Sequence, residues 1–594
     1  MKKTYILLFL IIFTHVSFAT IRYVSKTGSS TPPFTSWETA SDSIQKCVNI
    51  CVDGDTVIVA NGVYNEVIYI YTPIYLLGTS MDSTIVDGTG LLNTTLNIYA
   101  KATVENFEIK GWGSYAPSGV VIIQGHETLV KNCLITGAFN GFGIRSKAFV
   151  SNNIMKNVIF GISSSGSGSY DSVYIINNLF LVPANPGIGI SISNGRRFFI
   201  HNNVILALDR DAWFGISIDQ VQSAVITNNL VSGFKSSSAY DDSAPRDSAY
   251  LANNVFGNSG QSPNIFSVFA NVDIHMGTRT RALNNIVYNS YHGIMVLASL
   301  ATYDYNLLYK NVVNFRGYIN DGPNTVYGDP MFVKEKEPTL FSDHDFHLQM
   351  HSPGIDAGNP EILDADGTRS DIGMYGGPLG EIYEYLNLSP KVPRGLTAKI
   401  DSGYIKLKWE KNTESDFSHY KLYCGKTAGF PMDTTTLLAV LTDTSYNDTQ
   451  PTEPVTLYYK LTGVDTEKNE SDPTAEVKVT ITDVKGEETV TTDYALYQNY
   501  PNPFNGETKI PYMLKDRGRV KIKIYDIKGE LVKVVTDEEQ ESGYHEVNFS
   551  GSQLQGTNQG VDELASGIYL YRIEVIGEGG IPRYIDVKKM IMLK

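Results

Sequence analysis

Charged and aromatic side chains recur at related positions in the first half of the chain, where they could act on an acidic polymer. Two basic residues, Arg145 and Lys147, follow a Gly-Ile pair, and acidic and aromatic residues surround a later one. The acidic residues are Asp209, Asp211 and Asp219. The other residues of this set are the aromatic Trp112, Tyr115 and Trp213 and the basic Arg210. Carboxylates are the ligands that Ca²⁺ prefers, and a positioned basic side chain can accept a proton.

This set of residues predicts a division of roles if the chain is an enzyme. Lys147 and Arg145 are the candidates to take a proton beside a sugar carboxylate, and the three aspartates could hold Ca²⁺ as cofactor. Trp112, Tyr115, Arg210 and Trp213 would bind the sugar chain, because aromatic rings stack on sugar faces. The alternative is that the charged groups are solvated and that Trp213 covers an edge of the core.

An internal repeat must position these side chains. An Asn followed by an apolar residue recurs about every 25 residues, from Asn106 to Asn306, and short β-branched runs lie between. A Gly-Ile pair precedes several of these, beginning at Gly143, Gly161, Gly189, Gly215 and Gly293. Short strands at this period predict a parallel β-helix, with the Asn amides bonded from coil to coil. A leucine-rich horseshoe is excluded because its leucine framework is absent.

Stacking the coils on their Gly-Ile pairs predicts which side chains meet on one lateral face. The position after the Ile holds Arg145, Ser163, Ser191, Ser217 and Met295. Two residues further on stand Lys147, Ser165, Ser193 and Asp219. Because coils in a β-helix repeat at the strand spacing, each row should bring its members close together.

The N-terminal region predicts export and a cap for the stack. Residues 1–19 have two lysines, an apolar run and small residues before Ala19, the pattern of a cleaved signal peptide. A short helix is expected next, with Ser41 or Ser43 as N-cap. Its buried stripe would be Ile44, Cys47, Val48 and Cys51. No later run is long enough for a transmembrane helix.

Composition excludes two classes of protein. The net charge is −15, so the chain lacks the positive surface that a nucleic-acid-binding protein requires. Four cysteines are too few and too scattered for a disulfide framework, and they form no CxxC pair for zinc. The segment Asp364-x-Asp366-Gly367 resembles a Ca²⁺ loop but has Tyr375 where the final Glu belongs, so a turn is the favoured interpretation.

Several motifs in residues 20–386 carry a family resemblance. They include Gly54–Tyr64, Gly328–Phe332, Ser352–Gly358 and Asp371–Gly373. With them, this region resembles the secreted right-handed parallel β-helix proteins of the pectate-lyase superfamily. That superfamily includes lyases, hydrolases, epimerases and adhesins, so the resemblance implies a fold and no single activity. The motifs of its hydrolases, main pectate lyases and alginate epimerases are absent from this sequence. A lyase of another type is not excluded, because a lyase site needs fewer fixed residues.

The second half of the chain resembles two further families. Residues 390–483 have the fibronectin type III pattern, in which Trp409 would pack against a tyrosine of another strand. Residues 494–594, with Leu496–Asn505 and Val520–Glu530, resemble the C-terminal sorting domain of type IX secretion cargo. The resemblance implies a small β-sandwich that the type IX secretion machinery recognises, and secretion or attachment at the outer-membrane surface.

Together these features predict an all-β protein: a right-handed parallel β-helix with an N-terminal cap helix, followed by two β-sandwich domains. The predicted function is an exported protein that binds an acidic polysaccharide, and cleavage of that polymer by β-elimination is left open by the sequence. The alternative is a non-catalytic adhesin or structural surface protein. No nucleic-acid partner is expected, whereas a polysaccharide and the secretion machinery are.

Overall fold

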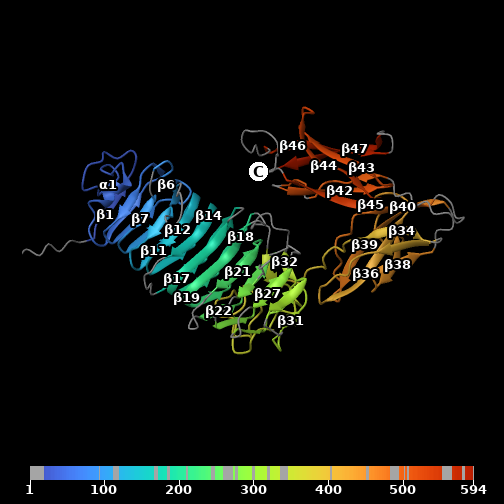
Figure 1. Cartoon of the computed structure of the whole chain (residues 1–594), viewed down its shortest axis with the longest axis horizontal. Helices are drawn as coiled ribbons and strands as arrows, with labels where there is room; N and C mark the ends of the chain where they lie inside the picture. Colours follow the sequence, from blue (N-terminus) through green and yellow to red (C-terminus); the bar gives the residue numbers. More distant parts are fainter. Residues whose placement is uncertain are drawn as a thin grey trace, which may run out of the picture. The chain divides into compact units, whose positions relative to one another are not determined.

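The computed structural model divides into two compact units, Met1–Leu386 and Asn387–Lys594, which are described separately (Figure 1). The structure describes residues 19–592 except 92–93, 112–118, 166–171, 184–186, 209–211, 242–247, 259–271, 275–278, 297–300, 318–321, 335–344, 402–403, 450–453, 482–493, 501, 505–506, 551–564 and 578–581. The predicted signal peptide therefore lies almost entirely outside the described residues.

The first unit is the predicted right-handed parallel β-helix, whose strands pair in parallel from coil to coil along three faces (Figure 1). We call these faces sheets A, B and C, in the order in which each coil visits them. Sheet A contains β1 (Ile21–Val24), β2 (Asp55–Val59), β5 (Ile74–Gly78), β8 (Ala102–Glu105), β11 (Thr128–Lys131), β13 (Ala148–Ser151), β15 (Val173–Ile176), the second halves of β17 (Ile188–His201) and β19 (Phe214–Thr227), β22 (Ser248–Ala252), β25 (Arg279–Leu283) and β28 (Thr302–Asp304).

Sheets B and C complete each coil. Sheet B contains β3 (Gly62–Tyr64), β6 (Thr84–Asp87), β9 (Glu108–Lys110), the first halves of β12 (Leu134–Ile144) and β14 (Ile154–Ser165), β16 (Leu179–Val182), β18 (Val204–Ala207), β20 (Leu230–Ser232), β23 (Val255–Gly257), β26 (Ile286–Tyr288), β29 (Leu307–Tyr309) and β31 (Val326–Tyr327). Sheet C contains β4 (Ile68–Ile70), β7 (Leu96–Ile98), β10 (Val121–Ile123), the other halves of β12, β14, β17 and β19, β21 (Ser236–Asp241), β24 (Val272–Ile274), β27 (His292–Val296) and β30 (Val313–Gly317).

The core of the β-helix consists of apolar side chains stacked in columns. Strands of sheet A alternate buried and half-buried residues, as in β2, so every second side chain points inward. One such column is fully buried and runs through Val57, Leu76, Val104, Val130, Val150, Ile175, Ile200, Ile226 and Leu251. This alternation is the reason that so short a repeat can build a continuous core.

The predicted asparagine ladder is present between sheets A and B. Its buried members are Asn153, Asn178, Asn203, Asn229, Asn254, Asn285 and Asn306. Each Oδ1 after the first accepts the backbone N–H and the Nδ2–H of the preceding asparagine, as in Asn178 to Asn203 at 3.0 Å for both bonds. The residue before each ladder position has a positive φ, which asparagine tolerates, and this explains the Asn-Asn pairs.

The first two members of the predicted ladder were assigned one residue too early. Asn106 and Asn132 occupy the positive-φ position, with φ of 64° and 52°. The buried side chains of Phe107 and Cys133 fill the ladder position in these coils, and the N–H of Cys133 donates to Asn153 Oδ1 at 2.9 Å. The ladder therefore begins at Asn153.

Helix α1 (Ile44–Val48) covers the N-terminal end of the stack, as predicted. Ser43 is its N-cap, and Ile44, Cys47 and Val48 are buried. The Glu66 carboxylate accepts hydrogen bonds from the Ser43 hydroxyl at 2.6 Å and from the backbone N–H of Ile44 at 2.8 Å. A carboxylate at a helix N-terminus satisfies donors that the helix leaves open.

Residues 352–379, which we call the closing segment, run back over the outside of the last coils. The Nδ2 atom of Asn228 donates to the carbonyls of Met374 and Gly376 at 2.9 and 2.7 Å. Asn253 donates to the Ser370 hydroxyl at 3.0 Å. An outer apolar cluster is buried where sheet B meets this part of the chain, including Leu230, Val255, Ile286, Leu307, Phe346 and Ile372.

Asp364 acts within the closing segment as a turn residue, in agreement with the favoured interpretation of its motif. Its carboxylate accepts the backbone N–H of Asp371 at 2.9 Å and that of Gly377 at 2.5 Å. Both oxygens are therefore engaged by the backbone, and burial raises the pKa of this carboxyl. The carboxylate ties two stretches of the segment together.

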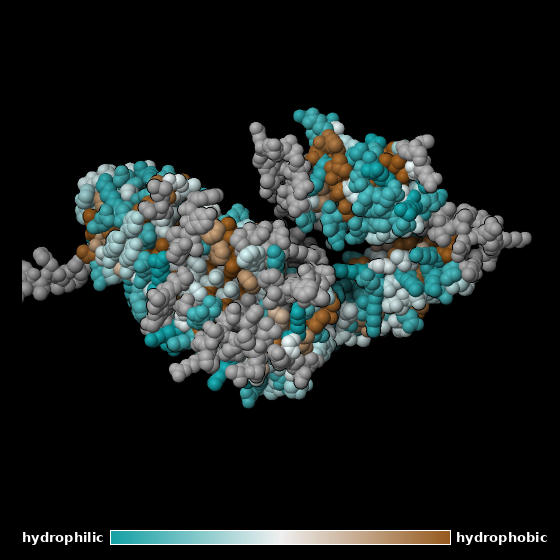
Figure 2. All heavy atoms as spheres, in the orientation of Figure 1, coloured by the Kyte–Doolittle hydropathy of each residue, from teal (hydrophilic) through white to brown (hydrophobic). Residues whose placement is uncertain are grey.

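In coils that precede the closing segment, the outer face of sheet B keeps half-buried apolar side chains, among them Leu134, Ile154, Leu179 and Val204. Hydrophobic residues accordingly reach the surface of the first unit between hydrophilic ones (Figure 2). The same face is polar at β9, where Glu108 and Lys110 form an ion pair at 3.2 Å.

The second unit contains two pairs of antiparallel sheets. In the fibronectin-like part, β34 (Thr397–Asp401), β35 (Tyr404–Lys408) and β38 (Ser445–Asp448) face β37 (Leu437–Leu441), β36 (Phe417–Gly425), β39 (Val455–Asp465) and β40 (Val477–Ile481). As predicted, Trp409 packs against a tyrosine, with its ring edge-on to Tyr420 at 5.4 Å. These sheets share one apolar core.

The C-terminal part has the same two-sheet architecture. One sheet contains β41 (Ala495–Leu496), β42 (Glu507–Leu514) and β45 (Gly543–Ser550), and the other contains β44 (Leu531–Gln540), β43 (Gly518–Tyr525), β46 (Gly567–Ile576) and β47 (Pro582–Met592). Its core includes Tyr512 and Tyr571, and the Tyr571 hydroxyl donates to the Tyr497 carbonyl at 2.8 Å. Two short strands, β32 (Phe332–Lys334) and β33 (Asp345–Leu348), pair antiparallel in the first unit.

Removal of one ladder amide should destabilise the β-helix strongly. In Asn203→Ala, the carbonyls of Ile175 and His201 and the amides of Asn178 and Asn229 lose buried partners. We expect a loss of about 3–5 kcal/mol, because unsatisfied buried polar groups each cost energy. Amide hydrogen exchange of β17 and β19 measures the loss. Asn65→Ala, at an exposed asparagine, is the control, and equal exchange in both variants would contradict the prediction.

The closing segment should gain stability as the pH falls. Burial raises the pKa of Asp371 to about 6, although the Asp356 N–H and the hydroxyls of Tyr383 and Tyr385 donate to its carboxylate. A carboxyl with a raised pKa stabilises the fold when protonated, so its contribution is present below about pH 4 and is lost as the pH rises through 6.

The variant Asp371→Asn isolates this effect from other titrating groups. Between pH 4 and pH 8, the wild-type protein should lose about 3 kcal/mol of stability relative to the variant. Amide exchange of residues 354–377, corrected for intrinsic rates, gives the difference at each pH. A difference that does not vary with pH would show that Asp371 keeps its ordinary pKa.

Candidate functional site

The outer face of sheet C contains the lateral rows that were predicted. Strand register aligns Gly143 with Ser163, and then Ser163, Ser191 and Ser217 with one another. Further along, Asp273 aligns with Met295 and Met295 with Arg316. We call this line the small-residue row, because its four central members carry only hydrogen or a hydroxymethyl group. The predicted row is confirmed for Ser163, Ser191, Ser217 and Met295, and Arg145 does not belong to it.

Arg145 lies two residues from its predicted place because β12 has glycines at both Gly141 and Gly143, and the prediction chose the second as the corner. Register pairs Phe142 with Ile162, so the corner glycine of this coil is Gly141. A Cβ at the equivalent corner Gly161 would stand 2.5 Å from the ring of Phe180 in the core, which is why glycine recurs at this position. Arg145 therefore takes the place in the next row that was predicted for Lys147.

This next row, the polar row, contains a ring pair, a guanidinium and a carboxylate. Its first members, Tyr71, Tyr99, Gln124 and Arg145, directly follow β4, β7, β10 and β12. The backbone bonds of Tyr99 to Ile70 and of Arg145 to Ile123, both 2.8 Å, continue the register of the strands. The rings of Tyr71 and Tyr99 stack at 4.9 Å. Ser193 and Asp219 follow in the later coils.

Lys147 lies at the turn into sheet A, in a third line of charged residues. Its Nζ is 2.9 Å from a carboxylate oxygen of Glu127, whose other oxygen is 3.1 Å from Lys101 Nζ. The hydrogen bonds from Lys147 and Lys101 lower the pKa of Glu127 to about 2. Glu127 is therefore ionised at neutral pH, and its charge favours the protonated form of Lys147.

The remaining predicted site residues are only partly described. Trp213 is 42% exposed and precedes β19, at the opposite edge of sheet C from Asp219. Six residues of extended strand place these two side chains about 20 Å apart. Trp112, Tyr115, Asp209, Arg210 and Asp211 lie outside the described residues. The aromatic pair that the structure does place on this face is Tyr71 and Tyr99, which sequence reasoning missed.

The last coils add polar groups to the same face. Asp273 in β24 is 2% exposed, and Arg316 in β30 has its Nη1 3.5 Å from Nε2 of His292 in β27. Arg316 was missed because its coil has Asn314-Phe315 in place of a Gly-Ile pair. The register of β27 and β30 would have located it.

The carboxylates that the structure describes bear on the predicted calcium site. Among them, one group of three could hold a metal ion: Asp416, Asp465 and Glu467 of the fibronectin-like part. Asp219 belongs to no such group in the described part of the β-helix. Asp209 and Asp211, the other two predicted ligands, lie outside the described residues, and Asp219 by itself supplies at most two of the six to eight oxygen ligands of Ca²⁺.

The C-terminal strands coincide with a known family. Residues 498–581 match the model of the Secretion system C-terminal sorting domain. The chain carries a type IX secretion sorting domain. The protein is thus exported by the type IX route and is secreted or held at the cell surface, as predicted. No described helix is long and apolar enough to cross a membrane.

Solved structures resemble parts of this type IX cargo. Pectate lyase Pel9A is 16% identical, and the match covers 61% of this chain and 97% of that one with a TM-score of 0.32. The A-module of the mannuronan C-5 epimerase AlgE6 of Azotobacter vinelandii is 14% identical over 49% and 96%, with a TM-score of 0.32. An Fn3-like protein from Clostridium thermocellum is 26% identical over 15% and 90%, with a TM-score of 0.14. No curated protein matches this chain.

Proposed function

We propose that this cargo protein binds an acidic polysaccharide along the outer face of sheet C and cleaves it by β-elimination. The observation that carries the proposal is the polar row, in which stacked tyrosines, Arg145 and Asp219 follow one another at the spacing of the coils. Successive coils stand about 4.8 Å apart, so a sugar chain parallel to the β-helix axis would meet a new member at each coil.

The small-residue row supports this orientation. Gly143, Ser163, Ser191 and Ser217 lie beside the polar row and project little from the sheet. Their short side chains leave space above the sheet for a polymer beside the polar row. The hydroxyls of the serines can bond to sugar hydroxyls, while the rings of Tyr71 and Tyr99 offer apolar edges.

Arg145 and Lys147 would divide the chemistry between charge neutralisation and proton transfer. A guanidinium beside a uronate carboxylate stabilises the charge that develops when the neighbouring C–H bond breaks. The base takes that proton, the electron pair forms a C=C bond, and the glycosidic oxygen leaves with a proton from solvent. Lys147 can act as the base only after it separates from Glu127, because the ion pair keeps it protonated.

The second candidate function is a non-catalytic adhesin. The pairing of Lys147 with Glu127 favours this alternative, since it makes Lys147 a poor base in the structure as it stands. An adhesin would use the same rows for binding and would leave the polymer intact. Turnover, and not affinity, therefore distinguishes the two functions.

The substitution Arg145→Ala should weaken binding to polyuronides about 10-fold, which is the scale of one lost charge-assisted hydrogen bond. Isothermal titration of the full chain at low salt against a panel of polyuronides and glycosaminoglycans gives the affinity. Ultraviolet absorbance of the unsaturated product, with Ca²⁺ or chelator, gives turnover. Lys147→Ala should abolish turnover and retain part of the binding.

Lys399→Ala is the matched control, because Lys399 is exposed in β34 of the second unit. It should leave both readouts unchanged. Binding with no absorbance change on any polymer would leave the adhesin as the function. Absence of binding to every polymer would refute the proposed site.

A bulky side chain on the small-residue row should block the polymer without unfolding the coil. In Ser191→Trp the indole would project from the middle of the row, between Ser163 and Ser217. We expect at least a 10-fold loss of polyuronide affinity, because the obstruction excludes several sugar contacts. The melting profile should match that of Ser445→Trp, an exposed control in β38. Unchanged affinity would place the polymer elsewhere.

A further inference from the structure

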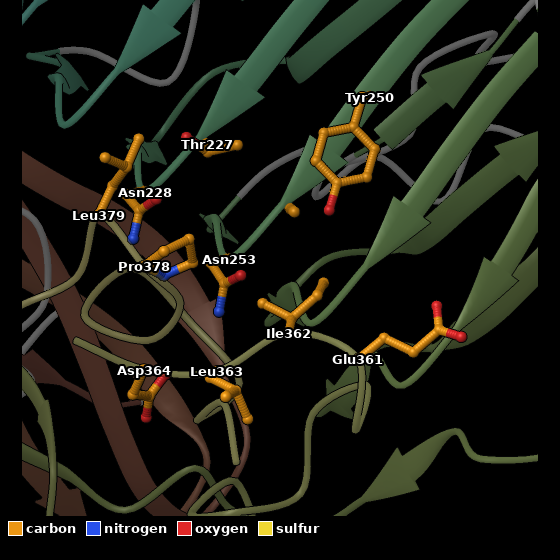
Figure 3. Close-up of a pocket in the computed structure, with 11 residues that line it drawn as sticks. Thr227, Asn228, Tyr250, Asn253, Glu361, Ile362, Leu363, Asp364, Pro378 and Leu379 are labelled. Atoms are coloured by element: carbon orange, nitrogen blue, oxygen red, sulfur yellow. The ribbon is translucent and has the colours of Figure 1, made fainter. Parts of the chain in front are cut away.

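A pocket of about 410 Å³ lies between sheet A and the closing segment, away from the rows of sheet C (Figure 3). Thr227, Tyr250 and Ala252 come from β19 and β22 and form the strand side. The opposite side is formed by the closing segment. The closing segment contributes residues 361–364, Pro378 and Leu379 to the lining.

The walls of this pocket are held in place by hydrogen bonds. Asn228 and Asn253 donate hydrogen bonds from their Nδ2 atoms to the closing segment, as described above. Both carboxylate oxygens of Asp364 accept hydrogen bonds from backbone N–H groups of the same segment. The pocket is therefore formed before a ligand arrives, which lowers the entropic cost of binding.

The polar groups that remain are mainly hydrogen-bond acceptors. Asn228 and Asn253 are each 2% exposed, and with their Nδ2 atoms engaged their Oδ1 atoms are the polar groups left for a ligand, whereas Glu361 offers an exposed carboxylate. Tyr250 projects from β22 with its hydroxyl toward the side of Ile362 (Figure 3). Burial raises the pKa of this phenol, so it stays protonated and can both donate and accept.

The charge of the lining disfavours an acidic ligand. Glu361 and Asp364 are acidic, and among the residues that the structure describes no lysine, arginine or histidine lines the pocket. Arg281 follows Tyr250 on the next coil but is not part of the lining. A uronate would meet like charge here, whereas a molecule with several hydroxyl donors would find acceptors.

Apolar groups complete the pocket. Leu363 and Leu379 are 49% and 50% exposed, and with Ile362 and Pro378 they present hydrocarbon beside the Tyr250 ring. A pyranose combines an apolar face with a rim of hydroxyl groups, and it therefore matches both parts of the lining. The volume is sufficient for one or two sugar units.

We propose that this pocket is a second glycan-binding site, which takes a neutral pyranose unit through Tyr250, Glu361 and the Oδ1 atoms of Asn228 and Asn253. The site differs from the sheet C face in ligand charge and in location. A protein with both sites would hold an acidic chain on one face and a neutral sugar on another. The second site does not depend on the first.

The test is a titration of the full chain with neutral mono- and disaccharides, followed by saturation-transfer NMR and calorimetry. Saturable binding is expected for at least one neutral sugar. Tyr250→Ala should lower the affinity at least 10-fold and Glu361→Gln about 5-fold, whereas the control Glu384→Gln, at an exposed carboxylate outside the lining, should change nothing. Ala252→Trp fills the pocket and should abolish binding.

Four results would overturn the proposal. They are no saturable binding to any neutral sugar, equal or tighter binding of glucuronate or galacturonate, tighter binding of a simple alkylamine, and affinities that Tyr250→Ala and Ala252→Trp leave unchanged. Arg145→Ala keeps the experiment separate from the proposed function, because it should weaken polyuronide binding and leave neutral-sugar binding intact. Amide exchange of residues 354–377 confirms that each variant retains the closing segment.

Discussion

The buried amide ladder from Asn153 to Asn306 fixes the register of the later coils, which carry Ser163, Ser191, Ser217 and Asp219 on sheet C. Each rung bonds to the next coil through two donors, and each amide also donates to the backbone, for example Asn203 to Ile175 at 2.8 Å. A slip of one residue between coils would leave these groups unsatisfied inside the protein. Polar side chains on sheet C can therefore be assigned neighbours by counting from the ladder.

Much of the fold could be predicted because each coil repeats the same physical demands. From Asn153 onward the inner turn holds an amide, several corners hold a glycine, and the columns hold β-branched or aliphatic residues. Both C-terminal sandwiches could also be predicted from sequence motifs. Trp409 indicated the first, and the motif near Leu496 indicated the second. In the β-helix, the repetition from coil to coil makes the prediction of the fold independent of any single residue.

The site was less predictable because it depends on small offsets. In β12 the Gly-Ile pattern selects Gly143, whereas the register of Phe142 opposite Ile162 shows that the corner is Gly141, which precedes a phenylalanine. The partner of Lys147 lies one coil back at Glu127, outside any local motif. The pocket at Tyr250 could not be predicted from the sequence, because its far wall comes from residues more than one hundred positions downstream.

The closing segment has a consequence for how the molecule reaches its final form. Asn228 bonds to Met374, 146 residues later in the chain. Contacts that close so long a loop form slowly, whereas early coils need only their immediate neighbours. Assembly of the β-helix should thus proceed from local stacking to a late wrapping step, and the cavity beside Tyr250 exists only after that step. A chain interrupted before residue 379 would present the stacked coils without this cavity.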